Sequence, residues 1–146
     1  MEAEGRIAKQ IGARGWYASV RLSLVPAAGR DVVLAPSSAN EWYKSEGWLD
    51  AAVAGAALGL ELADGTGRCS ITSVHGMPCD TSSALVLLAA VRAVWAALAF
   101  APNEVLASAV EGCITRGHQL SADAVRAELL RVARHAEPGA AADGGS

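Results

Sequence analysis

Three side chains that can act as acid, base or nucleophile lie within one short segment: His75, Cys79 and Asp80. A helix expected to begin just after them would lower the pKa of a thiol at its N-terminus, which makes Cys79 a candidate nucleophile and His75 its base. The same segment also suits structural roles, with Asp80 as a helix cap and Cys79 as a small filler. No other His or Cys has ligand spacing to them, so we expect no metal and no cofactor.

A second cluster combines acidic and aromatic side chains ahead of the first expected helix: Glu41, Trp42, Tyr43, Glu46 and Trp48. An apolar wall raises the pKa of a carboxylate toward values that are useful in acid-base catalysis. Glu41 or Glu46 could therefore serve in a small-molecule pocket lined by Trp42 and Trp48. The cluster could equally form a lid on the core or a dimer contact.

A glycine-interrupted basic segment is the third candidate. Arg14 lies between two glycines, with cations before it and an aromatic ring after it, so the segment can face a phosphate backbone. The candidate binding residues are Gln10, Gly12, Arg14, Gly15 and Trp16, with Arg6 and Lys9 nearby. A solvated N-terminal turn is the alternative. The net charge of -3 attracts no polyphosphate overall, so any nucleic-acid contact would have to be local.

The remaining histidines and Cys113 favour structural roles. His118 follows the third expected helix, and His135 lies in the last turn of the fourth, where a cation stabilises the helix dipole. Cys113 lies in the middle of a helix, which is typical of a small buried residue.

Strand periodicity is clearest after the basic segment. Between Ala18 and Leu24 the even positions are apolar and the odd positions are polar, which predicts a strand with one face on a core. Residues 26–30 have the composition of a hairpin turn, so we expect an antiparallel partner strand at 31–35. A β-rich run at 68–74 predicts a third strand.

Four helices are expected. The first spans 46–58, with Gly59 as its left-handed cap. Oxygen-bearing side chains at 80–83 can cap a long apolar helix at 84–101, which Pro102 ends. Its alanines and its central Arg92 favour a buried helix over a membrane span. The third helix spans 103–116, and the fourth begins after its cap, Ser121.

The order strand, strand, helix, strand, helix predicts an α+β domain in which helices cover one face of a sheet. We expect one domain at 1–137, with a core at about 7–100, a helical extension at 102–137 and a disordered tail at 138–146. Three cysteines without CxxC spacing, after a start that lacks a leader pattern, indicate a reduced, cytoplasmic protein with no membrane contact.

Two segments resemble the tip of domain IV of translation elongation factor G. The first is similar to that family's Gln-Ser-Gly-Gly-Arg-Gly-Gln-Tyr loop and the strand after it; the matching residues are Gln10, Gly12, Arg14, Gly15, Tyr17, Val20 and Pro26. The second, residues 76–83, is similar to the family's Gly-Ser-Tyr-His-Asp-Val-Asp-Ser-Ser loop before a long helix. The resemblance spans about residues 7–100. It implies the fold called ribosomal protein S5 domain 2-like, with both loops at a tip that enters the ribosomal decoding site.

The chain also departs from that family. The family's tip histidine falls near Pro78 or Cys79, Ala13 replaces a loop glycine, and the chain has no GxxxxGK(S/T) phosphate loop. We therefore expect a stand-alone, non-GTPase binding module that contacts the ribosome, RNA or another macromolecular partner through residues 10–16 and 76–80. One alternative is an enzyme or ligand-binding protein with an acid/base pocket for a small molecule. Another is a homodimerisation module that uses the alanine-rich helices.

Overall fold

The inward face of the longest strand confirms the alternating pattern. β2 (Arg14–Val25) buries Ala18, Val20, Leu22 and Leu24. The computed structural model describes residues 1–35 and 47–135. Its other elements are β1 (Glu2–Ile11), β3 (Arg30–Leu34), α2 (Trp48–Leu62), β4 (Gly67–His75), α3 (Ser83–Leu98), α4 (Glu104–Thr115) and α5 (Ala122–His135). The chain is therefore an α+β protein, as predicted.

The four strands form one sheet in the order β1-β2-β4-β3. β2 pairs antiparallel with both β1 and β4, whereas β3 pairs parallel with β4. The predicted hairpin between residues 18–24 and 31–35 is therefore wrong, because β4 lies between those two strands. Residues 26–29 instead pass the start of β4, where the N–H of Gly67 donates to the carbonyl oxygen of Gly29 at 2.8 Å. The parallel pair is connected through α2, as parallel strands require.

β1 is an element that the sequence does not predict. Its inward positions are Ala3, Gly5, Ile7 and Lys9, so a single large apolar residue marks that face. α3 crosses the strand so closely that a Cβ at Gly5 would overlap the carbonyl oxygen of Ala89. The small residues that permit this approach also hide the strand's alternation.

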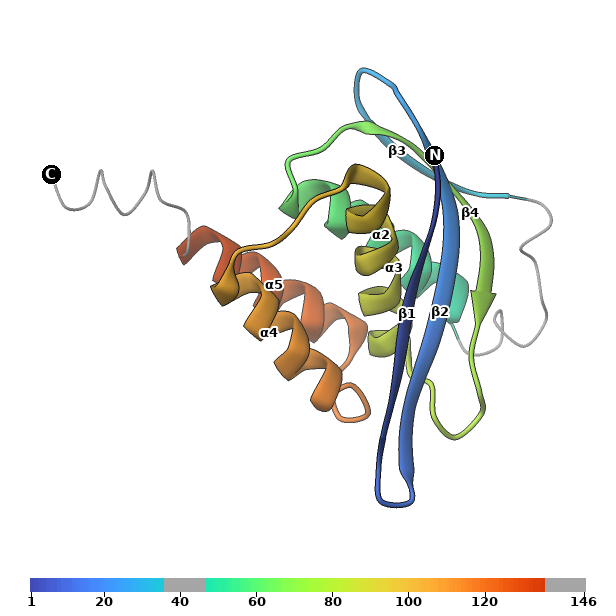
Figure 1. Cartoon of the computed structure of the whole chain (residues 1–146), viewed down its shortest axis with the longest axis vertical. Coiled ribbons are helices and arrows are strands. Elements are labelled where there is room, and N and C mark those ends of the chain that lie inside the picture. The colour runs from blue at the N-terminus through green and yellow to red at the C-terminus, as the bar shows by residue number, and fades with distance from the viewer. Residues whose placement is uncertain (36–46, 136–146) are drawn as a thin grey trace, which may run out of the picture.

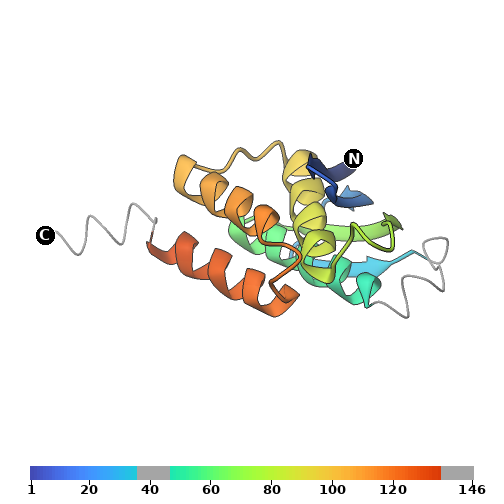
Figure 2. The ribbon, with the colours of Figure 1, turned by 90° about the horizontal axis from the view of Figure 1, so that it is seen from below.

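Helices cover one face of the sheet in two tiers (Figure 1). α3 packs on β1 and β2, and α2 packs on β3 and β4. α4 and α5 pack on each other and on the outer side of these two helices (Figure 2). The main core therefore lies between the sheet and the α2/α3 pair, and the C-terminal helices extend it.

α3 is buried as expected, but it ends at Leu98 with Ala99 as its left-handed cap, before Pro102. Every residue from Ala84 to Val91 is buried, and Arg92 alone in this helix carries a charge. Arg92 is half-buried, and its guanidinium pairs with Glu111 of α4. Within the described part of the chain, no helix is long and apolar enough to cross a membrane.

The contact between α2 and α3 depends on a glycine. A Cβ at Gly55 would overlap the carbonyl oxygen of Leu87 and would lie 2.8 Å from the Cβ of Ala90. Carbon atoms in ordinary contact are about 3.5–4.0 Å apart. The two helix backbones are therefore as close at this point as a missing side chain allows.

Gly59 does not cap α2, contrary to our expectation. The helix continues to Leu62, and the C-cap is Ala63. A Cβ at Gly59 would lie 3.0 Å from the Cβ of Val94. The carbonyl oxygen of Gly59 accepts a hydrogen bond from Trp95 Nε1 at 3.1 Å. Packing on α3, rather than a left-handed turn, explains this glycine.

Side-chain oxygens cap the N-termini of the last three helices. Ser82, rather than Asp80, caps α3: its Oγ accepts from an N–H of the first turn at 3.2 Å and donates to the carbonyl of Gly117 at 2.6 Å. Asn103 and Ser121 accept hydrogen bonds from N–H groups in the first turns of α4 and α5. Caps were expected at residues 80–83 and at Ser121, whereas Asn103 was expected inside the third helix rather than as its cap.

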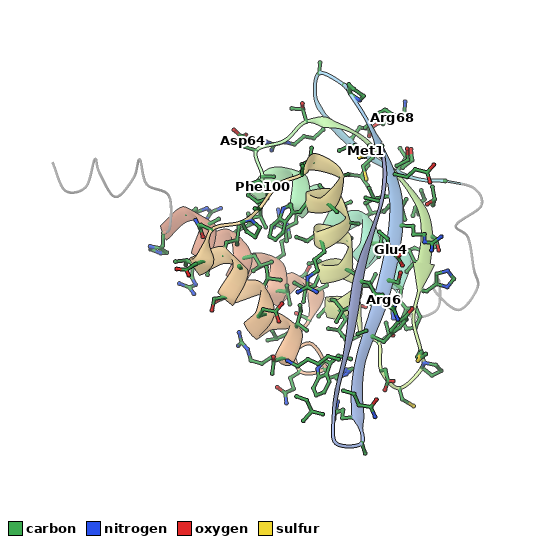
Figure 3. The ribbon with its side chains drawn as sticks, viewed as in Figure 1. Met1, Glu4, Arg6, Asp64, Arg68 and Phe100 are labelled. Carbon is green, nitrogen blue, oxygen red and sulfur yellow. The ribbon has the colours of Figure 1, made fainter. Side chains whose placement is uncertain are left out.

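The sheet face away from the helices carries paired polar side chains, including Glu4 and Arg6 on β1 (Figure 3). Glu4 Oε2 accepts from Ser19 Oγ at 2.6 Å, and Glu4 Oε1 lies 3.9 Å from a guanidinium nitrogen of Arg21. The hydrogen bond from Ser19, followed by the positive charges of Arg21 and Arg6, lowers the pKa of Glu4. Cross-strand polar pairs therefore stabilise this face.

Side chains from two helices reach β1, which is an edge strand among the described residues. Arg92 donates to the carbonyl oxygen of Arg6 at 3.3 Å while it pairs with Glu111. Lys9 Nζ donates to Thr115 Oγ1 at 3.1 Å. α3 is thus tied to the middle of this edge and α4 to its hairpin end.

Candidate functional site

The β1–β2 hairpin forms one end of the molecule and projects beyond the helices (Figure 1). A two-residue turn, Gly12 and Ala13, joins the paired residues Ile11 and Arg14. Gly12 has a φ of 62°, the left-handed region in which a glycine avoids the Cβ penalty. The glycine-interrupted basic segment is therefore a tight hairpin with two regular strands.

The loop from β4 to α3 is fastened to the first residues of β2. The N–H of Tyr17 donates to the carbonyl oxygen of Asp80 at 2.8 Å. Thr81 Oγ1 donates to the carbonyl oxygen of Tyr17 at 2.5 Å and accepts from the N–H of Met77 at 2.7 Å. These bonds join the two segments, 10–17 and 76–83, that the sequence relates to one family tip.

Gly15 leaves room for the side chain of Asp80. A Cβ at Gly15 would lie 2.7 Å from Oδ2 and 3.1 Å from Oδ1 of Asp80, closer than carbon and oxygen atoms pack. The half-buried carboxylate therefore lies directly over the backbone of β2. Within residues 1–35 and 47–135 its oxygens accept no hydrogen bond and form no ion pair.

The loop between α4 and α5 also reaches the hairpin. His118 Nε2 lies 2.7 Å from the carbonyl oxygen of Gly15, so this ring nitrogen carries the donated proton. The His118 ring packs on Trp16, with 5.3 Å between the ring centroids. Trp16 Nε1 is buried and has no hydrogen-bond partner in the described part of the chain. This geometry suits the structural role expected for His118.

A cavity of about 360 Å³ lies between the hairpin and the β4–α3 loop. An aromatic ring, a cation, an amide and a carboxylate all contribute to its walls. The lining residues are Ala8, Lys9, Gln10, Gly15, Trp16, Tyr17, Met77 and Asp80. Gln10, Gly15, Trp16 and Asp80 were candidates from the sequence, and the structure brings them together.

The two strands of the hairpin carry cations although the chain as a whole is acidic. Arg14 is exposed on the hairpin and forms no ion pair within the described residues. The guanidinium of Arg6 lies 5.8 Å from the ring centroid of Tyr17. Lys9 keeps two donors after its hydrogen bond to Thr115, because an ammonium group has three. The positive charge is local, which a nucleic-acid contact would need in this chain.

The proposed nucleophile and base lie in and before the same loop. His75 ends β4, and Cys79 is exposed four positions later, making no hydrogen bond within the described residues. Asp80 is placed by its backbone bond to Tyr17 rather than as a cap. Catalytic roles for these three residues stay predictions.

Of the aromatic and acidic cluster, the structure describes Trp48 alone. Glu41, Trp42 and Glu46 lie outside the described residues. Trp48 is 2% exposed, and a Cβ at Gly76 would lie 2.6 Å from its ring. Trp48 therefore packs in the core beneath the β4–α3 loop, and the small-molecule pocket that the sequence suggests around Trp42 and Trp48 stays a prediction.

The other cysteines are not available for chemistry. Cys69 and Cys113 are buried, as expected for Cys113, and burial raises the pKa of Cys69 to about 11 and that of Cys113 above its ordinary value. Among residues 1–35 and 47–135, no three His, Cys, Asp or Glu side chains are grouped closely enough to hold a metal ion.

Sequence reasoning placed Met77 and Thr81 in a tip segment without assigning their contacts, and it missed Thr115. Thr81 was counted among potential helix caps, but its hydroxyl bridges Met77 and Tyr17 instead. Thr115 contacts Lys9 across a separation of 106 residues, for which no local pattern gives a signal.

Comparison with known proteins adds little to this description. No family model matches the chain, and no curated protein is similar enough to match. One solved structure with a similar arrangement is a protein from Thermus thermophilus, at 21% sequence identity and a TM-score of 0.47. The match covers 80% of this chain and 20% of that one, so this chain spans about a fifth of its length. The likeness concerns the fold alone.

Proposed function

We propose that this protein is a binding module related to domain IV of translation elongation factor G, and that it contacts ribosomal RNA through its tip. The proposal is carried by the meeting of two segments, 10–17 and 76–83. Each resembles the family's tip by itself, and they are joined by the hydrogen bonds that Tyr17 makes with Asp80 and Thr81. This convergence supports one shared binding surface.

The charge distribution supports the same surface. Arg14, Lys9 and Arg6 lie on or beside the hairpin, whereas the whole chain has a net charge of -3. A polyanion would therefore be held by short-range contacts with these cations, and salt would weaken them by restoring counterions to the phosphates.

Cosedimentation with purified bacterial ribosomes tests this proposal. We expect wild-type protein to pellet with ribosomes at low salt and to be released as the salt rises. Arg14→Ala removes one phosphate contact and should weaken binding about threefold or more, with a shallower salt dependence. Arg134→Ala is the matched control, because it removes the same charge from an exposed position at the end of α5.

Two outcomes would overturn the proposal. One is no cosedimentation at low salt; the other is an equal loss of binding in Arg14→Ala and Arg134→Ala, which would indicate net charge rather than the hairpin. Circular dichroism of both variants checks that each keeps the wild-type fold.

A further inference from the structure

We infer that the tip cavity takes one unpaired guanine of the bound RNA, with the Asp80 carboxylate receiving its N1–H and N2–H₂ groups. This inference rests on the proposed function and adds the identity of the recognised base. The negative charge of Asp80 does not suit a surface that binds RNA, since a carboxylate would repel the phosphates that the nearby cations attract.

The backbone of Asp80 is fixed in place, but its carboxylate is unused. Its backbone oxygen accepts the N–H of Tyr17 at 2.8 Å, and the missing side chain at Gly15 leaves the space that its oxygens occupy. A carboxylate can accept about four hydrogen bonds, and within the described residues this one accepts none. The position therefore suits a ligand that brings adjacent donors.

Guanine is the RNA base that brings two such donors side by side. Its N1–H and N2–H₂ groups point the same way and match the two oxygens of one carboxylate. Adenine and cytosine place their amino group beside a bare ring nitrogen, which a carboxylate repels, and uracil has one N–H between two carbonyls. Asp80 thus favours guanine and acts against the other three bases.

The rest of the cavity suits a single nucleotide. Its volume of about 360 Å³ exceeds that of one base, and the half-buried ring of Tyr17 forms part of the wall, where a base can stack. The base must be unpaired, because a base pair would occupy the edge that Asp80 contacts.

Short uridine RNAs with one central guanine, inosine or adenine test the inference by fluorescence anisotropy against the full chain. We expect the guanine RNA to bind about tenfold more tightly than the adenine RNA, with inosine between them because it lacks the 2-amino group. Asp80→Asn should abolish this preference while retaining the overall affinity. Arg14→Ala should weaken all three RNAs by a similar factor.

The outcomes separate this inference from the proposed function. Equal binding of the three RNAs, still sensitive to Arg14→Ala, overturns the guanine assignment and leaves the function standing. A guanine preference that survives in a folded Asp80→Asn variant also overturns it. Failure of wild type to bind any RNA or ribosomes overturns both. Tryptophan fluorescence titration of wild type with guanosine and inosine monophosphates is a measurement that needs no variant; equal affinities contradict the two-donor contact.

Discussion

Adding one methyl group at Gly55 should destabilise this protein, although the same change usually stabilises a helix. Replacing glycine by alanine in a helix interior gains about 1 kcal/mol in helix propensity. At Gly55 the new Cβ would overlap the Leu87 carbonyl oxygen and lie 2.8 Å from the Cβ of Ala90. Overpacking costs about 1–3 kcal/mol, and contact with a backbone atom on the facing helix favours the upper end. A gain of about 1 and a cost of about 3 leave a net loss of about 2 kcal/mol.

Gly112→Ala is the matched control, because Gly112 also lies within a helix, α4, but a Cβ there would meet nothing within 4 Å. We expect this variant to gain about 1 kcal/mol. Urea unfolding followed by circular dichroism would measure both changes. In thermal unfolding they should appear as shifts of about 6 °C downward and about 3 °C upward for a chain of this size. Equal stabilisation by both substitutions would refute the close α2–α3 contact.

Two further predictions follow from the pKa shifts. Because the pKa of Glu4 is lowered in the folded state, its contribution is present above the ordinary value of 4.5 and is lost as pH falls through the folded value. Glu4→Gln should thus be less stable than wild type near neutral pH, and the difference should disappear as pH falls through the folded pKa of Glu4, as measured by urea unfolding; a difference that persists in stronger acid would contradict this. Burial raises the pKa of the Cys69 thiol to about 11, so a thiol reagent near pH 8 should modify Cys79 quickly and the buried Cys69 and Cys113 after unfolding. Any fast-reacting thiol that remains in folded Cys79→Ser would count against this assignment.

Local sequence patterns predicted which segments form helices and strands better than they predicted which strands lie next to each other in the sheet. The alternation from Ala18 to Leu24 and the polar caps before α3, α4 and α5 act over a few residues, so a single sequence displays them. The place of β4 between β2 and β3 is set by the whole core, and the turn-like residues 26–29 carry no sign of it. β1 was missed because two of its inward positions, Ala3 and Gly5, are small residues that allow α3 to pack closely, so the strand lacks a clear apolar alternation.

The candidate site divides in the same way. Residues 10–17 and 76–83 were selected because they resemble the tip of one family, and the structure places these two segments side by side. The cavity's chemistry could not be predicted, because the space over Gly15 and the orientation of the Asp80 carboxylate arise from contacts between distant segments. His118 likewise reaches Gly15 from 103 residues away, which no motif spacing encodes.

The hold of Arg92 on β1 bears on how copies of this chain meet. An exposed edge strand offers its backbone groups as a template on which another chain can add a strand and begin a fibre or precipitate. A strand laid along the middle of β1 would compete with Arg92 for the carbonyl oxygen of Arg6 and would disturb the pair that Arg92 forms with Glu111. At this point the edge is thereby protected from the strand-by-strand growth through which unprotected sheets aggregate.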